Sequence, residues 1–244
     1  MLIYNETSKN KQPKLNLPTF TVDGELSKKL NEYEITSLMN KSNVTLFLGK
    51  AGSGKTSLMT SFLNTPGLFY KIFHSVFLFM PPNSRASLSD NFFNKKIPED
   101  QIYDSLDFEQ LDEVFNNIQA NADENYQSLI IFDDVQKYLK DSAIQRLLLN
   151  IINNRRHLKT SLFFCCQNYN SIPRMIRQGL TDLFVFKINK TEMENIFLEH
   201  VEQYKEDFMN IMKNVYNEPH NFLYLNTNSQ RLFKNWDEII LKEN

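Results

Sequence analysis

The sequence contains few of the residues that mark several common protein classes. Only two of its 244 residues are cysteines, Cys165 and Cys166, and because they are neighbours they do not form an ordinary disulfide. We expect both to be core thiols in a reducing compartment. No apolar run approaches the ~20 residues that a membrane-spanning helix needs, and the N-terminus lacks the apolar core of a signal peptide. The sequence therefore indicates a soluble intracellular protein without a membrane span.

The sequence also lacks an excess of charge of either sign. Its 27 basic and 29 acidic side chains leave a net charge of −2. Proteins that bind a polyanion strongly usually have a basic excess, so any contact with nucleic acid must be local or shared between subunits. The hydrophobic fraction of 41%, with 20 phenylalanines and 10 tyrosines, is enough to bury a sizeable core in one large domain or two small ones.

Glycine is scarce, yet half of it is concentrated in one short stretch. Three of the six glycines fall within VTLFLGKAGSGKTSLMTSF, residues 44–62. The first part has the β-branched and apolar pattern of a buried strand, and the part after Gly54 has a helical pattern that ends at NTPG. Between them, GKAGSGKT fits G-x-x-x-x-G-K-[ST], the phosphate-binding P-loop. A Gly-rich turn that matches by chance is the alternative, and the strand–loop–helix context argues against it.

The chemistry of a P-loop explains this use of glycine. Backbone N–H groups must point at a phosphate, side chains would block its approach, and glycine reaches the positive φ angles that the loop needs. The following helix directs its N-terminal dipole at the anion. Lys55 is predicted to reach the β- and γ-phosphates of ATP, and Thr56 to offer its hydroxyl to Mg²⁺. The predicted nucleotide-binding residues are those of the loop itself: Gly49, Lys50, Ala51, Gly52, Ser53, Gly54, Lys55, Thr56 and Ser57.

The rest of the chain alternates between strand and helix patterns. Apolar runs predict strands within 71–82, 100–106, 128–134, 160–168, 181–189 and 220–228. Helical periodicity predicts helices at 24–42, 107–123, 141–159, 171–180 and 191–218, the last of them capped by Thr191. This alternation predicts an α/β fold with a mainly parallel central sheet flanked by helices. We expect a polar arm at 1–24 and a single P-loop ATPase domain at 25–244, with a helical and strand extension from about residue 190.

Two acids end the apolar strand predicted at 128–134. Asp133 stands where a Walker B carboxylate that holds Mg²⁺ should stand, and Asp134 is predicted to activate the attacking water. Gln167 ends the next apolar strand, which we expect between the P-loop strand and the Walker B strand, as in additional-strand ATPases. Its amide would sense the γ-phosphate or the water. The alternatives are an acidic strand end at a turn for the two aspartates and a turn-initiating residue for Gln167.

Four arginines flank the strand that ends at Gln167. Arg155 and Arg156 precede it, and Arg174 and Arg177 follow it. An arginine finger that acts across a subunit interface would come from such places, and Arg156 and Arg177 are the candidates. Basic surface residues near a helix C-terminus are the alternative. The four histidines show no metal-ligand spacing, so no metal other than the nucleotide's Mg²⁺ is expected.

One short motif suggests guanine rather than adenine. NKTE at 189–192 is close to the N-K-x-D sequence with which GTPases read guanine, but its acid is Glu. The residues after Asp133 also lack the glycine that a GTPase switch needs. Thr191 and Glu192 are explained as a helix cap and a first-turn acid, so we expect ATP.

In combination these motifs resemble one family. LFLGKAGSGKTSLM, SLIIFDDV, NNRRHLKTSLFFCCQN and IPRMIRQGLTDLFVF, within about 43–187, look like the viral genome-packaging ATPases of the FtsK–HerA superfamily. These are the poxvirus-type enzymes of large nucleocytoplasmic DNA viruses, virophages and polinton-like elements. The specific part is the order of the acidic pair, a helix, Arg-His-Leu, an apolar strand, Gln, and a Pro/Arg segment. The Asp-Asp pair departs from the common Asp-Glu, which puts the role of Asp134 in doubt.

The resemblance implies a RecA/FtsK-like ATPase that works as a homo-oligomeric ring, a hexamer, and pumps double-stranded DNA into a preformed capsid. It implies ATP and Mg²⁺ as cofactors and a capsid vertex or capsid proteins as partners. It places the protein in the host-cell cytoplasm or viral factory, with association with the virion as a further location. A ring also multiplies a small basic patch at its pore, for which the candidates are Lys95, Lys96, Arg155 and Lys159.

Three other readings remain open at this level. A small-molecule P-loop kinase would need an Arg-rich lid, which is not recognisable here. A nucleotide-bound scaffold for capsid assembly would not need the intact Lys55, Thr56 and Asp133. A third possibility is another FtsK–HerA-type translocase, for conjugation or DNA segregation, and only the family resemblance separates it from a packaging motor.

Overall fold

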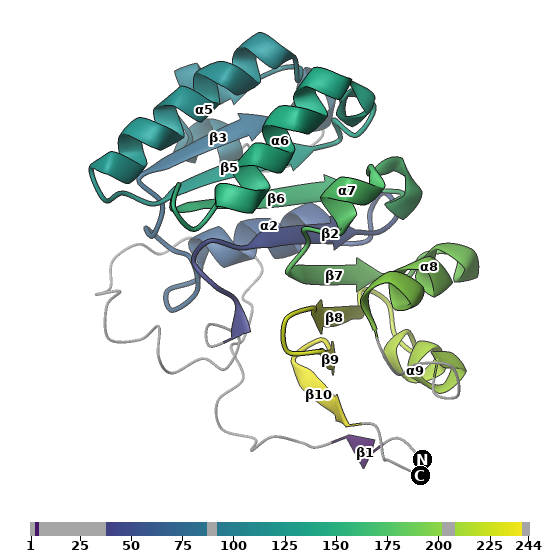
Figure 1. The fold of residues 1–244 in the computed structure, drawn as a ribbon. Helices are drawn as coiled ribbons and strands as arrows, with labels where there is room; N and C mark the ends of the chain where they lie inside the picture. The colour runs from purple at the N-terminus through teal and green to yellow at the C-terminus, as the bar shows by residue number, and fades with distance from the viewer. Residues whose placement is uncertain (1–2, 5–37, 87–91, 202–207, 241–244) are drawn as a thin grey trace. The chain divides into compact units, whose positions relative to one another are not determined.

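The structure is a computed structural model that describes residues 3–4, 38–86, 92–201 and 208–240. It divides into two compact units (Figure 1). The first unit comprises Met1–Asn40, Phe47–Tyr70 and Thr181–Asn244, and the second comprises Lys41–Leu46 and Lys71–Leu180. Strand β2 (Val44–Leu48) contributes residues to both. Nearly all of the arm predicted at 1–24, and most of the helix predicted at 24–42, lie outside the described residues.

The second unit is built on a parallel sheet. Its strands are β3 (Ser75–Phe79), β4 (Ile102–Tyr103), β5 (Ser128–Asp133) and β6 (Thr160–Cys166). They lie in the order β6-β5-β3-β4, and each neighbouring pair is parallel. The first residues of β2 lie on the other side of β6, where the Leu162 N–H donates to the Asn43 carbonyl over 2.9 Å. A strand therefore lies between β2 and β5, which confirms the additional-strand arrangement.

A row of aromatic rings crosses this parallel sheet. Tyr103, Phe79, Phe132 and Phe164 are successive register partners on four neighbouring strands. Since partners in register project from the same face, their rings stack, with centroids 4.8, 5.4 and 4.8 Å apart. The three phenylalanines are almost fully buried, so the row forms part of the core of this unit.

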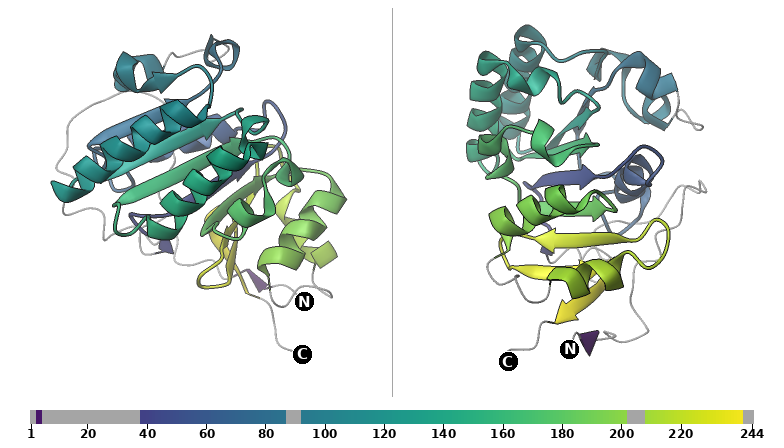
Figure 2. Two further views of the ribbon diagram at one scale, coloured as in Figure 1. Left: turned by 45° about the horizontal axis from the view of Figure 1, so that its top comes forward. Right: turned by 90° about the vertical axis from the view of Figure 1, so that its right-hand side faces the viewer.

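Helices flank this sheet, and those at 108–123 and 142–154 begin within one residue of the predicted starts, whereas the helix predicted at 171–180 is limited to 174–177. The helices of the second unit are α3 (Pro82–Ala86), α4 (Phe92–Lys96), α5 (Phe108–Asp123), α6 (Ser142–Asn154) and α7 (Arg174–Arg177), with short 3₁₀ turns at Glu99–Gln101, Tyr138–Lys140 and Tyr169–Ser171. Asp107 caps α5 by accepting from the Gln110 N–H, and Asp141 caps α6. Figures 1 and 2 show α5 and α6 side by side over the strands. Both cysteines are buried thiols on β6, as predicted.

The first unit has an antiparallel sheet. Its strands are β7 (Asp182–Phe186), β8 (Phe222–Asn226), β9 (Arg231–Lys234), β10 (Asp237–Ile240) and β1 (Ile3–Tyr4), in that order. Every neighbouring pair among them is antiparallel. The last residues of β2 lie beside β7 and extend a second aromatic row, which runs through Phe47, Phe184, Tyr224 and Phe233. Helix α2 (Lys55–Asn64) packs on this row through Phe62, whose ring lies 5.2 Å from that of Phe184.

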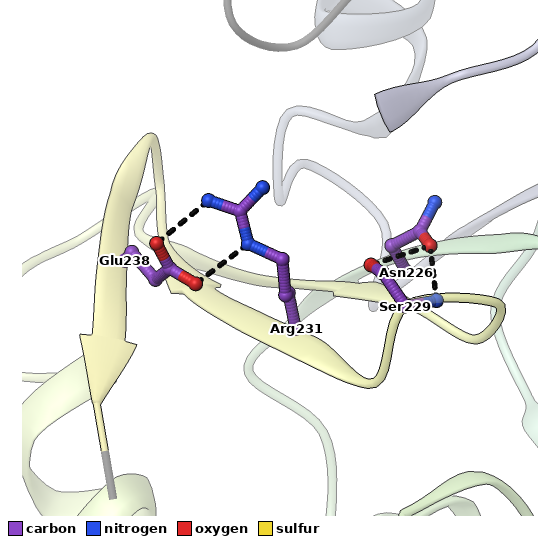
Figure 3. Close-up of polar contacts among 4 residues, drawn as sticks. All are labelled: Asn226, Ser229, Arg231 and Glu238. Carbon is purple, nitrogen blue, oxygen red and sulfur yellow. Dashed lines mark hydrogen bonds and ion pairs between the residues drawn. The ribbon is translucent and has the colours of Figure 1, made fainter. Parts of the chain in front are cut away.

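Side-chain hydrogen bonds and one ion pair hold the hairpins of the first unit (Figure 3). In the turn between β8 and β9, the Asn226 Oδ1 accepts from both the N–H and the hydroxyl of Ser229. Between β9 and β10, Arg231 donates two hydrogen bonds of 2.6 Å to the two carboxylate oxygens of Glu238. Bidentate pairs of this kind fix geometry as well as charge, so the register of this edge is well defined.

The predicted C-terminal helix differs from the structure in its bounds and its cap. Instead of one helix over 191–218, the described residues contain α8 (Lys190–His200) and α9 (Phe208–Val215). Helix α8 ends because Val201 adopts an extended conformation (φ −121°, ψ 119°). Its cap is Asn189, not Thr191: the Asn189 Oδ1 accepts from the Glu192 N–H over 2.8 Å. Among the described residues no helix is long and apolar enough to cross a membrane.

Candidate nucleotide site

The glycines of the predicted P-loop occupy positions that only glycine fills without strain. Gly52 and Gly54 have φ angles of +73° and +106°, in the region that side chains with a Cβ rarely adopt. Gly49 has a different reason: a Cβ there would lie 2.6 Å from the Ser53 Oγ and 2.7 Å from the Phe186 Cβ. The loop is therefore shaped by its backbone, as the motif predicts.

The polar groups of this loop suit a phosphate chain. Gly54 caps α2 without a side-chain hydrogen bond, so no cap side chain occupies the first-turn N–H groups of the helix. Lys55 is buried in the loop, and its Nζ donates to the Lys50 carbonyl over 2.9 Å. The Ser53 Oγ is buried without a hydrogen-bond partner among the described residues. A cationic Nζ, a helix N-terminus and a glycine-lined backbone together fit an anionic phosphate group.

Two residues that were not predicted from the sequence contact the P-loop. Phe186 ends β7, and its ring would be 3.4 Å from a Cβ at Gly54. His220 lies in the turn before β8, and its Nδ1 is 3.1 Å from the Ser53 carbonyl oxygen. Neither residue carries a local sequence signal for this role, because one reads as a strand residue and the other as a turn residue.

The predicted acids of the second unit lie at the carboxyl end of β5. Asp133 is the last residue of the strand and is buried. Asp134 follows in a left-handed conformation with φ +58°, and its N–H donates to the Cys165 carbonyl at the end of β6 over 3.2 Å. Left-handed backbone outside glycine is uncommon, and Asp is among the residues that tolerate it.

The Asp134 carboxylate is held by two further side chains that sequence reasoning missed. The Ser84 hydroxyl on α3 donates to its Oδ2 over 3.1 Å, and the Gln136 amide donates to its Oδ1 over 3.2 Å. Ser84 comes from a segment after β3, 50 residues before Asp134 in the chain. Because β3 and β5 are parallel neighbours, their carboxyl ends meet at one edge of the sheet, and this explains the contact.

Gln167 directly follows β6 and is exposed, at the same edge of the second unit as Asp133.

The predicted arginines are divided between the two ends of β6. Arg177 lies on α7, beyond the carboxyl end; its guanidinium donates to the Asn170 Oδ1 and lies 4.6 Å from the Tyr169 ring centre. Arg156 is exposed in the turn that precedes β6, at the opposite end from Asp133. Its side chain makes no hydrogen bond or ion pair within the described part of the chain.

The Arg155 side chain makes structural hydrogen bonds within the second unit. Its Nε donates to the Ser42 carbonyl and its Nη1 to the Ile152 carbonyl, which ties the end of α6 to the segment before β2. This makes Arg155 a poor candidate for a pore contact with DNA. Lys159 likewise hydrogen-bonds with Asn125. Lys95 and Lys96 remain exposed at the end of α4.

The NKTE segment forms a helix cap. The Asn189 Oδ1 accepts from the Glu192 N–H, and its amide donates to the Glu192 carboxylate over 3.0 Å. Both side chains are therefore used by the start of α8. Within the described ranges, no three His, Cys, Asp or Glu side chains gather as a ready-made metal site.

Known proteins resemble most of this chain. The family described as "Poxvirus A32 protein" matches residues 30–232. The DNA packaging protein OPG160 of variola virus is 27% identical over 169 residues, which cover 67% of this chain and 60% of that protein. The vaccinia virus protein of the same name gives the same identity and coverage. The chain thus spans about three fifths of the length of these relatives.

Solved structures resemble the fold. The DNA-packaging ATPase B204 from Sulfolobus turreted icosahedral virus has a TM-score of 0.61 at 16% identity, over 84% of this chain and 100% of that one. B204 from Sulfolobus turreted icosahedral virus 2, in complex with AMP, has a TM-score of 0.60 over 81% of this chain and 98% of that one, also at 16% identity. EssC from Geobacillus thermodenitrificans reaches 0.52 at 15% identity, over 82% of this chain and 39% of that one. These likenesses confirm the predicted fold class.

Proposed function

Because the chain belongs to the Poxvirus A32 protein family, we propose that it is an ATP-hydrolysing motor that translocates double-stranded viral DNA into a preformed capsid. The observation that carries this proposal is the P-loop of the first unit, with two glycines at positive φ and a third where a Cβ would collide. The names of the relatives, DNA packaging proteins, supply the substrate and the task.

Each unit contributes its own part of the chemistry. We propose that the loop N–H groups and Lys55 bind the phosphates of ATP, and that Thr56 and Asp133 hold Mg²⁺, which neutralises charge on the phosphate oxygens. Asp134 accepts a proton from the attacking water, and its hydrogen bonds to Ser84 and Gln136 orient the carboxylate for that task. Gln167 hydrogen-bonds the γ-phosphate or the water.

The assembly and the location extend the same proposal. The motor acts as a homo-oligomeric ring, a hexamer, against a capsid vertex, in the host-cell cytoplasm or viral factory, and stays with the virion in some copies. Either Arg156 or Arg177 acts as the finger in a neighbouring subunit's site. A small-molecule kinase is not favoured, because neither the curated relatives nor the solved structures named above are kinases.

The test is ATP hydrolysis by the purified full chain, with and without double-stranded DNA. We expect DNA to stimulate hydrolysis and Lys55→Ala to abolish it. Asp134→Asn should lower kcat by about a hundredfold or more, the typical contribution of a general base, and still bind ATPγS, since the amide keeps the shape of the carboxylate.

One control variant and two contrary outcomes complete the test. Glu124→Gln removes an exposed carboxylate from the end of α5 and should leave hydrolysis unchanged. Hydrolysis that is indifferent to DNA at every protein concentration would contradict a translocating motor. ATP binding without any turnover, even with DNA, would instead favour a nucleotide-bound scaffold.

A further inference from the structure

The Ser53–Gly54 peptide of the P-loop is held from outside the loop by one hydrogen bond. The Nδ1 of His220 lies 3.1 Å from the Ser53 carbonyl oxygen. A carbonyl oxygen only accepts, so Nδ1 carries the hydrogen and donates it. His220 follows Ser53 by 167 residues and belongs to the turn between α9 and β8 in the same unit.

This bond sets the direction of the Gly54 N–H, one of the loop donors that are predicted to face a phosphate. In a trans peptide the C=O of one residue and the N–H of the next point in opposite directions. A Ser53 carbonyl that is fixed on the side of His220 therefore turns the Gly54 N–H to the other side of the loop. Gly54, with φ +106°, is otherwise free of the limits that a Cβ imposes, so its peptide needs an external restraint.

His220 is itself fixed by the residues that follow it. The next residue, Asn221, is buried, and its amide donates to the Val215 carbonyl at the end of α9 over 3.1 Å. The Asn221 Oδ1 in turn accepts from the amide of Asn235, in the turn between β9 and β10, over 3.0 Å. The backbone of His220 is therefore tied, through its neighbour Asn221, to α9 and to the turn between β9 and β10.

The P-loop also packs against the side chains of this region. A Cβ at Gly54 would be 3.4 Å from the Phe186 ring and 3.7 Å from the His220 Nδ1. The Phe186 ring packs 5.6 Å from that of Phe222, which comes two residues after His220. The same short segment therefore supplies a hydrogen bond to the loop and an aromatic surface under it.

We propose that His220 is a positioning residue for nucleotide binding, through which the C-terminal extension sets the shape of the P-loop. The proposal rests on the proposed ATPase function. It does not make His220 a catalytic residue, since the imidazole acts through the Ser53–Gly54 peptide. Loss of the bond should weaken the binding of ATP more than it slows the hydrolysis of ATP already bound.

Two substitutions separate the hydrogen bond from the backbone. His220 has φ +62°, a conformation that both glycine and asparagine accept. His220→Gly removes the bond without adding strain. His220→Asn keeps an amide N–H near the position of Nδ1 and should restore the bond. Gln230→Gly is the matched control, because Gln230 is also exposed, has φ +55°, and donates a side-chain hydrogen bond of 2.8 Å to a backbone carbonyl, that of Thr227.

The measurement is the Kd for Mg²⁺–ATPγS by calorimetry on the purified full chain, with KM and kcat for ATP beside it. We expect His220→Gly to raise Kd and KM about fivefold, the equivalent of one ordinary hydrogen bond, with kcat at saturation within twofold. His220→Asn and Gln230→Gly should stay within twofold of the wild type.

The outcomes distinguish this inference from the function on which it rests. If Lys55→Ala abolishes binding but His220→Gly leaves Kd and KM unchanged, the positioning role is wrong and the ATPase stands. If Gln230→Gly weakens binding as much as His220→Gly, the effect is one of general stability and the positioning role is again wrong. If the wild-type protein binds no ATPγS, both proposals fail.

Discussion

The two units place their candidate functional groups in different ways. In the first unit the P-loop uses backbone: Gly52 and Gly54 take positive φ angles, and Gly49 leaves room for Ser53 and Phe186. In the second unit the candidates are charged or polar side chains at strand ends, with Asp134 held by its neighbours. The strand pairs differ as well: they are antiparallel in the first unit and parallel in the second.

This difference indicates which kind of substitution each unit tolerates. A loop made of backbone donors is sensitive to any added atom that changes its shape, whatever its charge. Side chains at the ends of parallel strands keep their place when an isosteric group replaces them, and lose their chemistry when the charge is removed. We therefore expect volume to decide function in the first unit and charge to decide it in the second.

The largest expected effect concerns charge at an exposed arginine of the second unit. Arg156→Ala should lower the kcat of the ring about a thousandfold, the lower range for an arginine finger, because its side chain is exposed and has no bond within the described residues. Arg177→Lys should keep kcat within a few-fold, since Arg177 is engaged by Asn170 and Tyr169. The measurement is hydrolysis by each variant and by rings mixed from Arg156→Ala and Lys55→Ala subunits.

An arginine that acts in trans has a specific signature in that assay. Arg156→Ala subunits and Lys55→Ala subunits, each inactive alone, should regain part of the hydrolysis when mixed, because an intact P-loop can then lie beside an intact arginine. Arg146→Ala serves as the control, since Arg146 is exposed on α6 and its one hydrogen bond to the described residues is to the Ser142 carbonyl of its own helix. No recovery in the mixed rings, or a large loss of kcat for Arg177→Lys, would contradict Arg156 as the finger.

A smaller effect is expected when the same Gly→Ala substitution adds side-chain volume in each unit. A Cβ at Gly49 would lie 2.6 Å from the Ser53 Oγ, and a Cβ at Gly179 would lie 2.6 Å from the Ile152 Cγ2. Overpacking costs roughly 1–3 kcal/mol at either place, or a fall in Tm of about 2–10 °C. Only Gly49→Ala should also weaken ATPγS binding, by about tenfold or more, because it alone deforms the phosphate loop. Equal binding by the two variants would contradict the division between the units.

The smallest effect tests how closely the acid of the second unit is held. Ser84→Ala removes the hydrogen bond to the Asp134 Oδ2 and should lower kcat about threefold, less than the full strength of a hydrogen bond to a charged group, because the Gln136 amide still holds the carboxylate. The Kd for ATPγS should not change. Ser171→Ala is the control, since its hydroxyl donates to the Asn168 carbonyl in the same unit without reaching Asp134. A kcat that rises or stays constant would show that the bond does not orient the carboxylate.

The parts of this site that the sequence predicts are those encoded locally. The P-loop and the strand that ends at Asp133 each need only a few neighbouring residues to be recognised. The parts that it does not predict are contacts between distant segments. Ser84 meets Asp134 because β3 and β5 are neighbours, and His220 meets Ser53 from 167 residues away.

The C-terminal part shows a second limit. Apolar periodicity over 191–218 favours one long helix, but the structure has two helices among the described residues and a cap two residues earlier than expected. Both Asn189 and Thr191 are good capping residues. The choice between them depends on which one has the extended backbone before the helix, and Asn189 has it, with ψ 157°. The pattern of residue types cannot decide this.

The left-handed backbone at Asp134 bears on which amino acids this position can accept. At φ +58° the short side chains of Asp and Asn, and glycine without one, fit far better than the longer Glu. The Asp-Asp pair is then the form of the acidic pair that this turn accommodates, and a change to Asp-Glu would have to be accompanied by a change in the turn. Asn and Gly would preserve the turn without the carboxylate, Glu would preserve the carboxylate at the expense of the turn, and Asp alone satisfies both requirements.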